Sequence, residues 1–464
     1  MSDPVAELAR IEPDGWLVGG TVRDRLLERA TSDYDVAIAG PVADVARTLG
    51  RAAGGYAFEL SEAFGAWRVV AHDHAWQIDL LPLNGDTIEE DLARRDFTIN
   101  AIAAPLSREG YVDPFGGLED LRARRLRAVS AEAFERDPLR TLRLARIACE
   151  LGFEVEAETL ELARRAAPAL AGVAPERVFA ELRRVLCAPA ALQGLELMDR
   201  IGVTDVILPE LAALRGVEQS RYHHLDVYGH TRSVLAETIA LERDPERLVG
   251  AEAPALVDYL ATPLANELTR GEALRFGALL HDIAKPQTRA VTPQGRVTFM
   301  GHDESGARLA SEILGRLRAS ERLREHVAAL TRHHLRLGFL VHEMPLSRRA
   351  VYDYLHVTAP VAVDVTVLSV ADRLATRGDN AERAIARHVE LARQMLAEGL
   401  AWIADPPRPP LRGDELARAL GIKPGPMVGG LLAELEAASF SGEVATREEA
   451  IARARELIAA GAEE

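Results

Sequence analysis

The clearest pattern of apolar and polar positions near the start of the chain covers residues 17–38. It predicts a short strand, a tight turn at Gly19 and Gly20, a helix, a brief loop and a second strand. Asp33 and Asp35 open that second strand. Because side chains two positions apart on a strand share one face, we expect both carboxylates to point the same way.

Further periodicity predicts a helix over 42–54 and two strands over 66–72 and 75–83, joined as a hairpin near His72. Asp79 falls inside the second of these strands. A buried carboxylate is costly unless it is paired or bound to metal, whereas an exposed one on an edge strand needs no partner. Both interpretations of Asp79 stay open from the pattern alone.

The next long helix is predicted to begin near Asp137, which can cap it, and to end at Gly152. Apolar residues at helical spacing mark its buried face: Leu144, Ile147, Ala148 and Leu151. Polar residues mark other faces: Asp137 and Arg140 together, with Arg143 and Arg146 further along. A second helix is expected over 175–186.

From about residue 191 the pattern is helical, and it carries most of the histidines. Imidazole and carboxylate groups fall on apolar helices in a fixed order: His230, His281, Asp282, His302, His333 and Asp372. His334 adjoins His333 and fits that position equally well. One buried histidine is usually packed and hydrogen-bonded, but this series favours a site for a divalent transition metal that activates water.

These patterns predict an α+β head with a mixed sheet, followed by all-α regions. We expect a head over 1–125, a helical neck over 126–190, a helical body over 191–380 and a helical tail over 381–464. A proline-rich segment precedes the last helices of the tail.

Composition agrees with a largely helical protein, because 48% of its 464 residues are hydrophobic and only 5% aromatic. The first ten residues lack the apolar run of a signal peptide, and no apolar stretch is long enough to span a bilayer. Cys149 and Cys187 lie far apart without metal-type spacing. We therefore expect a cytoplasmic protein with no membrane partner and with buried, reduced thiols.

A net charge of −16 argues against a protein that coats nucleic acid indiscriminately. The arginines are nevertheless clustered over residues 122–146, which indicates either a solvated helix face or a local phosphate-binding strip. RNA therefore remains a candidate partner.

The motif over residues 17–38 contains the residue types that nucleotidyl transfer requires. Gly19 and Gly20 let backbone amides approach a phosphate closely, and Arg23 lies one turn further on. Asp33 and Asp35 can grip two Mg²⁺ ions. In this order and spacing, the motif resembles that of the tRNA nucleotidyltransferase and bacterial poly(A) polymerase family of the class II, CCA-adding type.

The resemblance extends over most of the chain. It implies that Asp79 is a third catalytic carboxylate, and that Arg95, Asp96 and Asn100 in ARRDFTINAIA contact the sugar and phosphates of the incoming nucleotide. A hinge-like motif follows around Asp113. Glu181 lies in a helix that resembles the ion-paired, neck-stabilising fifth motif of the family.

The resemblance further implies that the protein itself selects the base, through Asp137 and Arg140. An aspartate accepts from the exocyclic amine of cytosine or adenine, while an arginine donates to the ring nitrogen beside it. Uracil and guanine would leave buried groups unpaired, at about 1–3 kcal/mol each. The family has Glu before this aspartate, where the chain has Arg136, so the match is partial. Arg143 and Arg146 are assigned to nucleotide binding with them.

Family members that add all three nucleotides carry a flexible loop after the third carboxylate. Here residues 80–83 run almost directly into the next motif, through an Asn84-Gly85 pair that is a strong hairpin signal. We therefore favour an enzyme that adds two cytidines to tRNA from CTP. Full CCA addition, A addition from ATP and poly(A) synthesis are the alternatives.

The histidine series resembles the two-metal form of the HD phosphohydrolase superfamily, with Ni, Mn, Fe or Zn as candidate metals. As a different class of function, the chain could act mainly as an HD phosphohydrolase whose head only binds RNA. The sequence leaves the oligomeric state and the HD substrate open.

Overall fold

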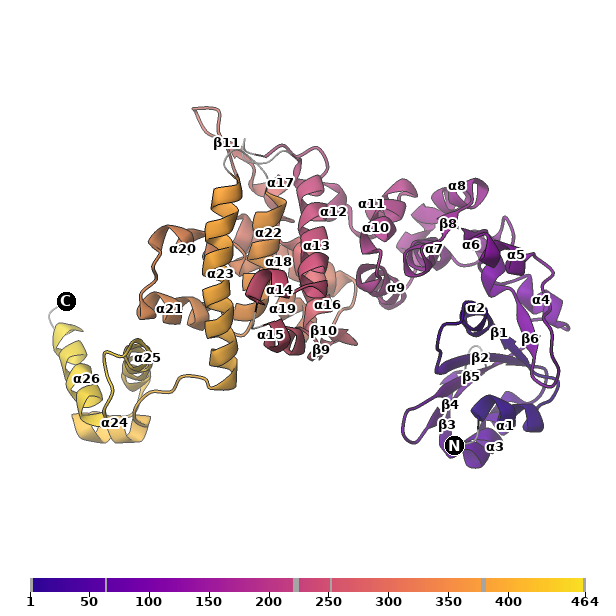
Figure 1. Cartoon of the computed structure of the whole chain (residues 1–464), viewed down its shortest axis with the longest axis horizontal. Coiled ribbons are helices and arrows are strands. Elements are labelled where there is room, and N and C mark those ends of the chain that lie inside the picture. Colours follow the sequence, from indigo (N-terminus) through magenta and orange to yellow (C-terminus); the bar gives the residue numbers. More distant parts are fainter. Residues whose placement is uncertain (1–2, 63–64, 220–224, 251–252, 377–380, 462–464) are drawn as a thin grey trace. The chain divides into compact units, whose positions relative to one another are not determined.

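The computed structural model describes residues 3–62, 65–219, 225–250, 253–376 and 381–461. The chain forms two compact units, Met1–Ile207 and Leu208–Glu464. The first unit holds the expected head and neck, and the second holds most of the expected body and the tail (Figure 1). The four narrower domains stay predictions.

A six-stranded mixed sheet organises the first unit, with strand order β3-β4-β5-β2-β1-β6. The strands are β1 (Trp16–Val18), β2 (Asp33–Ile38), β3 (Gly55–Ser61), β4 (Ala66–Ala71), β5 (Gln77–Pro82) and β6 (Ala103–Pro105). Within this sheet, β2 and β5 pair in parallel, and the other neighbouring strands pair antiparallel. Figure 1 shows α1 (Pro4–Ile11) and α3 (Val42–Ala53) on one side of the sheet and α2 (Gly20–Leu26) on the other. This α+β head with a mixed sheet confirms the predicted fold class.

The register of the sheet fixes which residues share the face away from α3. Asp35 lies opposite Asp79, and Asp79 lies opposite Arg68 on β4. Trp67 points to the other face, where the Arg47 guanidinium of α3 lies 4.6 Å from its ring centroid. The carboxylates and Arg68 therefore form one row on the face that α3 leaves open.

The link between β5 and α4 (Ile88–Leu92) is only residues 83–87, so the short connection predicted from the sequence is confirmed. The hairpin predicted at Asn84-Gly85 is wrong, because a helix follows instead of a returning strand. The Thr87 hydroxyl caps α4 by accepting from the Glu90 N–H, and the Asp91 carboxylate accepts from the Asn84 N–H. The Thr87 cap and the bond between Asp91 and Asn84 therefore favour a helix over the hairpin turn.

The remainder of the first unit is mainly helical. Its elements are η2 (Thr98–Asn100), α5 (Gly117–Arg122), β7 (Arg125–Leu126), α6 (Ala133–Arg136), α7 (Leu139–Leu151), β8 (Glu154–Val155), α8 (Ala157–Ala166), η3 (Ala167–Gly172), α9 (Pro175–Cys187), α10 (Ala191–Arg200) and α11 (Val203–Ile207). β7 and β8 form a short parallel pair. As predicted, Gly152 ends α7 in the left-handed conformation. The predicted cap is wrong by one position, because Pro138 is the N-cap residue; Asp137 precedes it and its carboxylate accepts from the Leu139 N–H at 3.2 Å.

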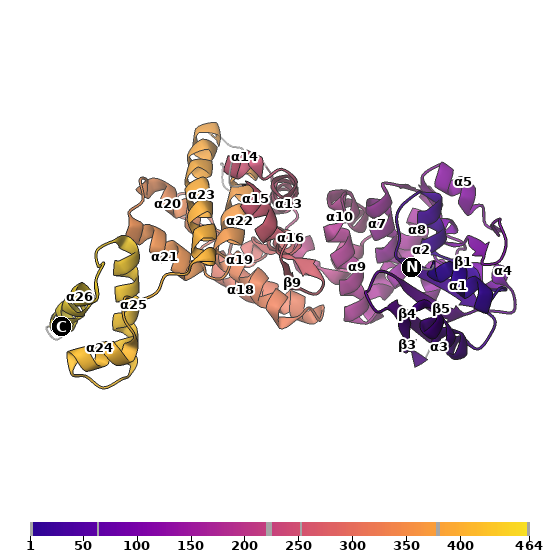
Figure 2. The same ribbon diagram turned by 60° about the horizontal axis from the view of Figure 1, so that its bottom comes forward.

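The second unit is built on helices. They are α12 (Pro209–Ala212), α13 (Val227–Arg243), α14 (Glu246–Val249), α15 (Ala253–Leu260), α16 (Arg270–Leu280), α17 (Lys285–Thr288), α18 (His302–Arg316), α19 (Glu321–His333), α20 (Arg336–Leu340), η5 (Val341–Glu343), α21 (Arg348–Thr358), α22 (Ala362–Ala375) and α23 (Ala381–Ala404). Two strand pairs join them, β9 (Pro263–Ala265) with β10 (Leu268–Thr269) and β11 (Ala290–Val291) with β12 (Val297–Thr298). Helices α13, α16, α19 and α22 pack together (Figure 2).

The tail consists of α24 (Gly413–Leu420), α25 (Pro426–Ser441) and α26 (Arg447–Gly461). These helices bury a core of their own around Leu416 and Leu435. No single helix of the described residues is long and apolar enough to cross a membrane; α21 and α22 meet that test only together, across a bend of 99°.

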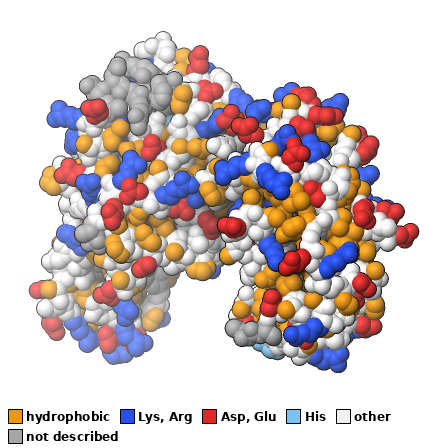
Figure 3. Space-filling model, turned by 45° about the vertical axis from the view of Figure 1, so that its right-hand side comes forward, with side chains coloured by type: hydrophobic (Ala, Val, Ile, Leu, Met, Phe, Trp, Pro, Cys, Tyr) orange, Lys and Arg blue, Asp and Glu red, His pale blue; other side chains and the backbone are white. Residues whose placement is uncertain are grey.

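Two surface features refine the sequence-based expectations. Cys149 is buried as predicted, but Cys187 is half-buried, so the prediction that both thiols are buried is wrong for Cys187, which ends α9. On the face seen in Figure 3, Lys and Arg side chains are interspersed with Asp and Glu, without a continuous basic surface.

Gly117 is required by close packing against the Thr98–Asn100 turn. A Cβ at this position would lie 2.1 Å from the Thr98 carbonyl oxygen and 2.8 Å from Ile102 Cγ1. We expect Gly117→Ala to lower the free energy of unfolding by about 2 kcal/mol, because backbone must move to admit the methyl group. Urea unfolding measures this, with Gly172→Ala as control, since a Cβ there meets nothing within 4 Å. Equal stability of the two variants would contradict the packing argument.

Candidate functional site

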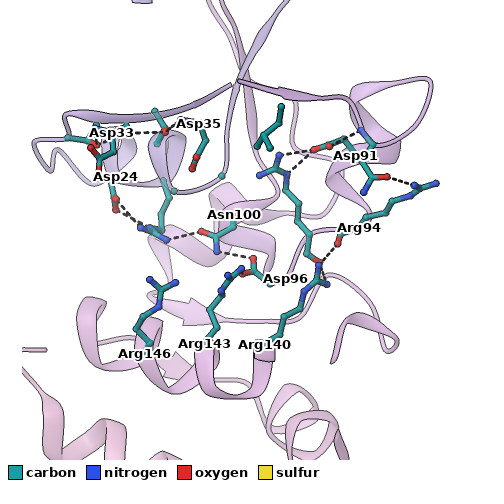
Figure 4. A pocket seen from close by; sticks show the side chains of 18 of the residues that line it. Asp24, Asp33, Asp35, Asp91, Arg94, Asp96, Asn100, Arg140, Arg143 and Arg146 are labelled. Carbon is teal, nitrogen blue, oxygen red and sulfur yellow. Dashed lines mark hydrogen bonds and ion pairs between the residues drawn. The ribbon is translucent and has the colours of Figure 1, made fainter. Parts of the chain in front are cut away.

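A cleft of about 860 Å³ in the first unit collects most of the residues singled out in the head and neck (Figure 4). The predicted residues that line it are Gly19, Gly20, Arg23, Asp33, Asp35, Arg95, Asp96, Asn100, Arg140, Arg143 and Arg146. Asp79 and Asp137 do not line it. They lie beside it, on β5 and just before α7.

The Gly19 turn brings three parts of the cleft together. Gly19 has φ +66°, and a Cβ there would lie 2.9 Å from Arg95 Nη1 and 3.4 Å from Asp35 Oδ2. Glycine is therefore needed both for the conformation and for the close approach. The Thr21 hydroxyl, one residue into α2, accepts a 2.7 Å hydrogen bond from the Asp35 N–H and fixes α2 against β2.

Asp33 and Asp35 share one face of β2, as predicted, and both line the cleft. Burial raises the pKa of Asp35 to about 6; the charges of Asp79 and Asp33 add to this, while Arg95 opposes it. Clustered carboxylates of this kind are stabilised by a cation, and oxygen ligands are those that Mg²⁺ prefers. The donor set therefore fits a magnesium site.

Asp79 lies beside Asp35 on the neighbouring strand, as the resemblance implies. Its carboxylate is bound by Arg68, whose Nε and Nη2 atoms donate to Oδ1 and Oδ2 at 2.6 and 2.8 Å. Both oxygens are thus engaged by a guanidinium in this conformation. Its role as a third metal ligand stays a prediction.

A chain of polar contacts crosses the floor of the cleft (Figure 4). Arg23 donates to the Asn100 side-chain oxygen at 2.9 Å, and the Asn100 amide donates to Asp96 Oδ1 at 2.9 Å. Arg143 of α7 contacts Asp96 Oδ2 and Glu181 Oε1, each at 3.3 Å. The contacts connect α2, the Asn100 turn, α7 and α9 within one unit.

Asp96 is the buried centre of this chain. Burial alone would raise its pKa, but the Arg143 guanidinium, the Asn100 amide and the Phe97 N–H hold the pKa below its ordinary value. Arg146 adds a 2.7 Å ion pair between its Nε and Glu181 Oε2. Asp96 and Arg146 therefore support the cleft through buried ion pairs.

The proposed base-selecting pair makes protein contacts in this conformation. Arg140 donates to the carbonyl oxygens of Arg95 and Ala133 at 3.0 and 3.1 Å, and to that of Arg94 at 2.6 Å. Asp137 Oδ2 accepts from Arg177 at 2.8 Å. The selection of bases by this pair stays a prediction.

Two residues of this region were not identified from the sequence. Asp91 is buried, holds Arg95 through a 2.9 Å hydrogen bond and also binds the Asn84 N–H. Its spacing of four residues from Arg95 on a helix was the signal that could have found it. Arg68 is placed only by the sheet register, which no local pattern reveals.

The second unit gathers the predicted histidines and aspartates around Asp282. His230, His281 and Asp282 form one group whose ligand atoms lie within 4.8 Å of one another, and Asp282, His302 and His334 form another. Asp372 Oδ1 lies 3.0 Å from His230 Nε2. Asp282 belongs to both groups, which suits a carboxylate shared by two metal ions.

The histidine tautomers support this interpretation. The Nδ1–H groups of His281, His302 and His334 donate to the carbonyl oxygens of Ala278, Phe299 and Thr331, at 2.9, 2.6 and 2.6 Å. In the neutral form of each ring, Nε2 then carries the lone pair that a metal requires. Within the described residues, the Nε2 atoms of His281 and His302 are buried without a hydrogen-bond partner. Backbone carbonyls orient metal-binding histidines in this way, so the donors fit a transition metal.

The structure distinguishes the two adjacent histidines. Burial and the neighbouring His281 lower the pKa of His334 to about 4, so its ring is neutral and faces Asp282. His333 instead accepts a 2.9 Å hydrogen bond from Arg336 Nε and lies outside both groups. The sequence left the two histidines open as alternatives; the structure brings His334, and not His333, into the group with Asp282 and His302. His281 and Asp282 also lie just past the end of α16, whereas the pattern had placed them inside a helix.

Family models match three parts of the chain. Residues 15–127 match the poly(A) polymerase head domain, and residues 152–214 match a probable RNA- and SrmB-binding site of polymerase A. Residues 227–377 match the HD domain. The matched segments follow the same order as the head, the neck and the histidine-rich body.

Similar proteins extend along nearly the whole chain. An A-adding tRNA nucleotidyltransferase of Deinococcus radiodurans is 37% identical, with 94% of each chain covered. A CC-adding tRNA nucleotidyltransferase of Thermus thermophilus is also 37% identical, over 94% of this chain and 92% of its own. A solved CCA-adding enzyme in its apo form has a TM-score of 0.65 at 20% identity, covering 98% of this chain and 92% of that one, a likeness of fold.

We expect Asp96→Asn to lower the free energy of unfolding by about 3 kcal/mol at pH 7, because it leaves Arg143 facing a neutral partner. The pKa of Asp96 is depressed in the folded state, so its contribution is complete above its ordinary value near about 4 and is lost as pH falls through the lower, folded value. The difference between variant and wild type should therefore shrink below about pH 4.

Urea unfolding of both proteins at pH 7 and at acidic pH measures this difference, with the exposed Asp14→Asn as control. A difference that is independent of pH would contradict the role of the Asp96 charge.

We expect His334→Ala to weaken metal binding by the second unit about tenfold or more, because a ligand is lost. His333→Ala is the matched control and should leave the metal content unchanged. Elemental analysis of purified proteins, followed by titration with Mn²⁺ or Ni²⁺, measures both. A similar loss in the two variants would show that His334 has no special place in the centre.

Proposed function

Since the chain belongs to the CCA-adding family of tRNA nucleotidyltransferases, we propose that it extends the 3′ end of tRNA with cytidines, without a nucleic-acid template. The observation that carries this proposal is the pair Asp33 and Asp35 on one face of β2, beside the Gly19 turn and a cleft lined with arginines. That arrangement brings carboxylates, a phosphate-binding turn and cationic side chains into one place.

The residues of the chain position the triphosphate. Arg23 and Arg95 both line the cleft, and each is held by a carboxylate, Asp24 and Asp91 respectively. Guanidinium groups fixed in this way can bind phosphate oxygens with little loss of side-chain freedom. Asn100, held between Arg23 and Asp96, is positioned to contact the nucleotide sugar.

Asp33 and Asp35 are the proposed metal ligands. Mg²⁺ bound to them would supply charge neutralisation at the triphosphate and leaving pyrophosphate, and would acidify the tRNA 3′-hydroxyl. Asp79, next to Asp35 and paired with Arg68, is proposed to complete the carboxylate set. Its guanidinium partner balances its charge when no cation is bound.

Base selection is proposed for Asp137 and Arg140, at the start of α7. An amine of cytosine would donate to the Asp137 carboxylate in place of Arg177, the present donor. Arg140 would donate to the ring nitrogen from a guanidinium anchored on backbone carbonyls. The anchoring keeps the two groups at a fixed separation.

Addition of two cytidines is favoured within the family by the short link between β5 and α4, residues 83–87. Overall similarity does not separate A addition from CC addition, because the A-adding relative and the CC-adding relative are each 37% identical to this chain. The length of this link, and not overall similarity, therefore supports CTP as the substrate. Full CCA addition and addition of A from ATP are the alternatives.

The metal centre around Asp282 supports a second proposed activity, metal-dependent hydrolysis of a phosphate ester. Its two ligand groups share one carboxylate, and backbone carbonyls hold the Nδ1 sides of His281 and His334, which leaves their Nε2 atoms facing Asp282. Lys285 Nζ lies 2.6 Å from Asp282 Oδ2 and adds a cation beside the proposed metals. A phosphate would be attracted to this positive charge.

Incubation of tRNA that lacks its 3′ end with labelled CTP, ATP or both tests the first proposal. We expect a product two nucleotides longer with CTP and no further growth with ATP. Asp35→Ala should lower CTP incorporation about a thousandfold, since several kcal/mol of transition-state stabilisation is lost. Hydrolysis of p-nitrophenyl phosphate or a cyclic nucleotide by that variant should be unchanged.

The exposed Asp14→Asn serves as control for the incorporation assay. His281→Ala should show the reverse pattern, with normal incorporation and lost hydrolysis. A terminal A added after two cytidines would refute CC-only addition. Normal incorporation by Asp35→Ala would refute the whole assignment of the head.

A further inference from the structure

Two aromatic side chains of β3 lie on the open face of the sheet. Tyr56 and Phe58 are 42% and 41% exposed, and they are two residues apart on the edge strand. Their rings are nearly parallel, with an interplanar angle of 22° and centroids 6.0 Å apart. Only Tyr111 and Phe339 join them as exposed Phe, Tyr or Trp residues in the described part of the chain.

The register connects these rings to the catalytic carboxylates. Phe58 lies opposite Arg68, which lies opposite Asp79, which lies opposite Asp35. Tyr56 heads the next row, which passes through Val70 and Gln77 to Asp33. Directly opposed residues share a face, so the aromatic pair and the carboxylates lie on the same side of the sheet.

The separation suits a nucleic-acid strand that leads to the reacting group. Three strand spacings place Phe58 about 14 Å from Asp35. A few unpaired nucleotides span such a distance, with Arg68 between the two ends and able to face their phosphates. Solvent-exposed aromatic rings on a sheet are a common means of stacking unpaired RNA bases, whatever their identity.

We propose that Tyr56 and Phe58 form a stacking surface for the unpaired nucleobases at the 3′ end of the tRNA, behind the nucleotide that carries the reacting hydroxyl. The proposal rests on the proposed function, because it takes tRNA as the substrate. It assigns the aromatic pair to RNA rather than to a protein, because the pair continues the row of polar residues that ends at Asp35. Stacking tolerates any base, which suits an enzyme that acts on many tRNAs.

The test compares alanine variants with variants that keep the ring. Phe58→Ala and Tyr56→Ala should each weaken binding of tRNA lacking its 3′ end about tenfold in filter-binding assays without nucleotide. The KM for tRNA should rise accordingly, and the KM for CTP should stay unchanged. Phe58→Tyr and Tyr56→Phe should behave as wild type. Glu59→Ala is the matched control, since Glu59 is exposed on the same strand but points to the other face.

Abasic RNA identifies the occupant directly. Transcripts are made with one abasic nucleotide at each of the last unpaired positions. At one of these positions, the abasic transcript should bind wild-type protein as weakly as intact tRNA binds Phe58→Ala. The affinity of that transcript should not fall further when the protein carries Phe58→Ala. The stacking surface would be refuted if, at every abasic position, Phe58→Ala lowered the affinity further by the same factor as with intact tRNA. Alanine variants that bind tRNA normally would refute it as well. A wild-type dimer that dissociates in the alanine variants would do so as well, and would assign the face to self-association.

These outcomes are separable from failure of the proposed function. Wild type that binds tRNA but incorporates no nucleotide refutes the transferase proposal, and the binding comparison still stands. Wild type that incorporates CTP while Phe58→Ala binds tRNA normally refutes only the stacking surface.

Discussion

The arrangement of the first unit depends on one buried negative charge, the carboxylate of Asp96. A charge in the protein interior is tolerated only when it is paired and hydrogen-bonded, so its partners must be held in place. Asn100 and Arg143 satisfy its two oxygens, and Arg143 in turn reaches Glu181 on α9. The resulting contacts fix the floor of the cleft against two helices, and they keep Asn100 and Arg23 in its lining.

Local patterns were sufficient for much of the fold. The unit from β1 to β2, the hairpin of β4 and β5 and the end of α7 at Gly152 all follow from periodicity and from glycine or cap signals. The Asn84-Gly85 hairpin failed because the Thr87 cap and the Asp91 bond to the Asn84 N–H favoured a helix, which the turn dipeptide alone does not reveal. Short-range signals therefore succeed where no tertiary contact competes with them.

The sequence predicted which residues form the site better than it predicted the contacts between them. Spacing on one strand placed Asp33 and Asp35 correctly on a common face. The bidentate pair of Arg68 and Asp79 depends on how β4 lies against β5, and the choice of His334 depends on which way α19 faces after its last turn. Such facts arise from register and helix rotation, which one sequence does not specify by itself.

The short link between β5 and α4 has a consequence for how such enzymes can diverge. A residue inserted in β5 ahead of Asp79 would reverse the facing of the side chains that follow in that strand and would separate Asp79 from Asp35. Extra residues placed between Pro82 and Ile88 leave the alternation of side chains along the strands unchanged. Change in chain length at this one junction can therefore bring new groups to the mouth of the cleft while the inherited chemistry beneath it is preserved.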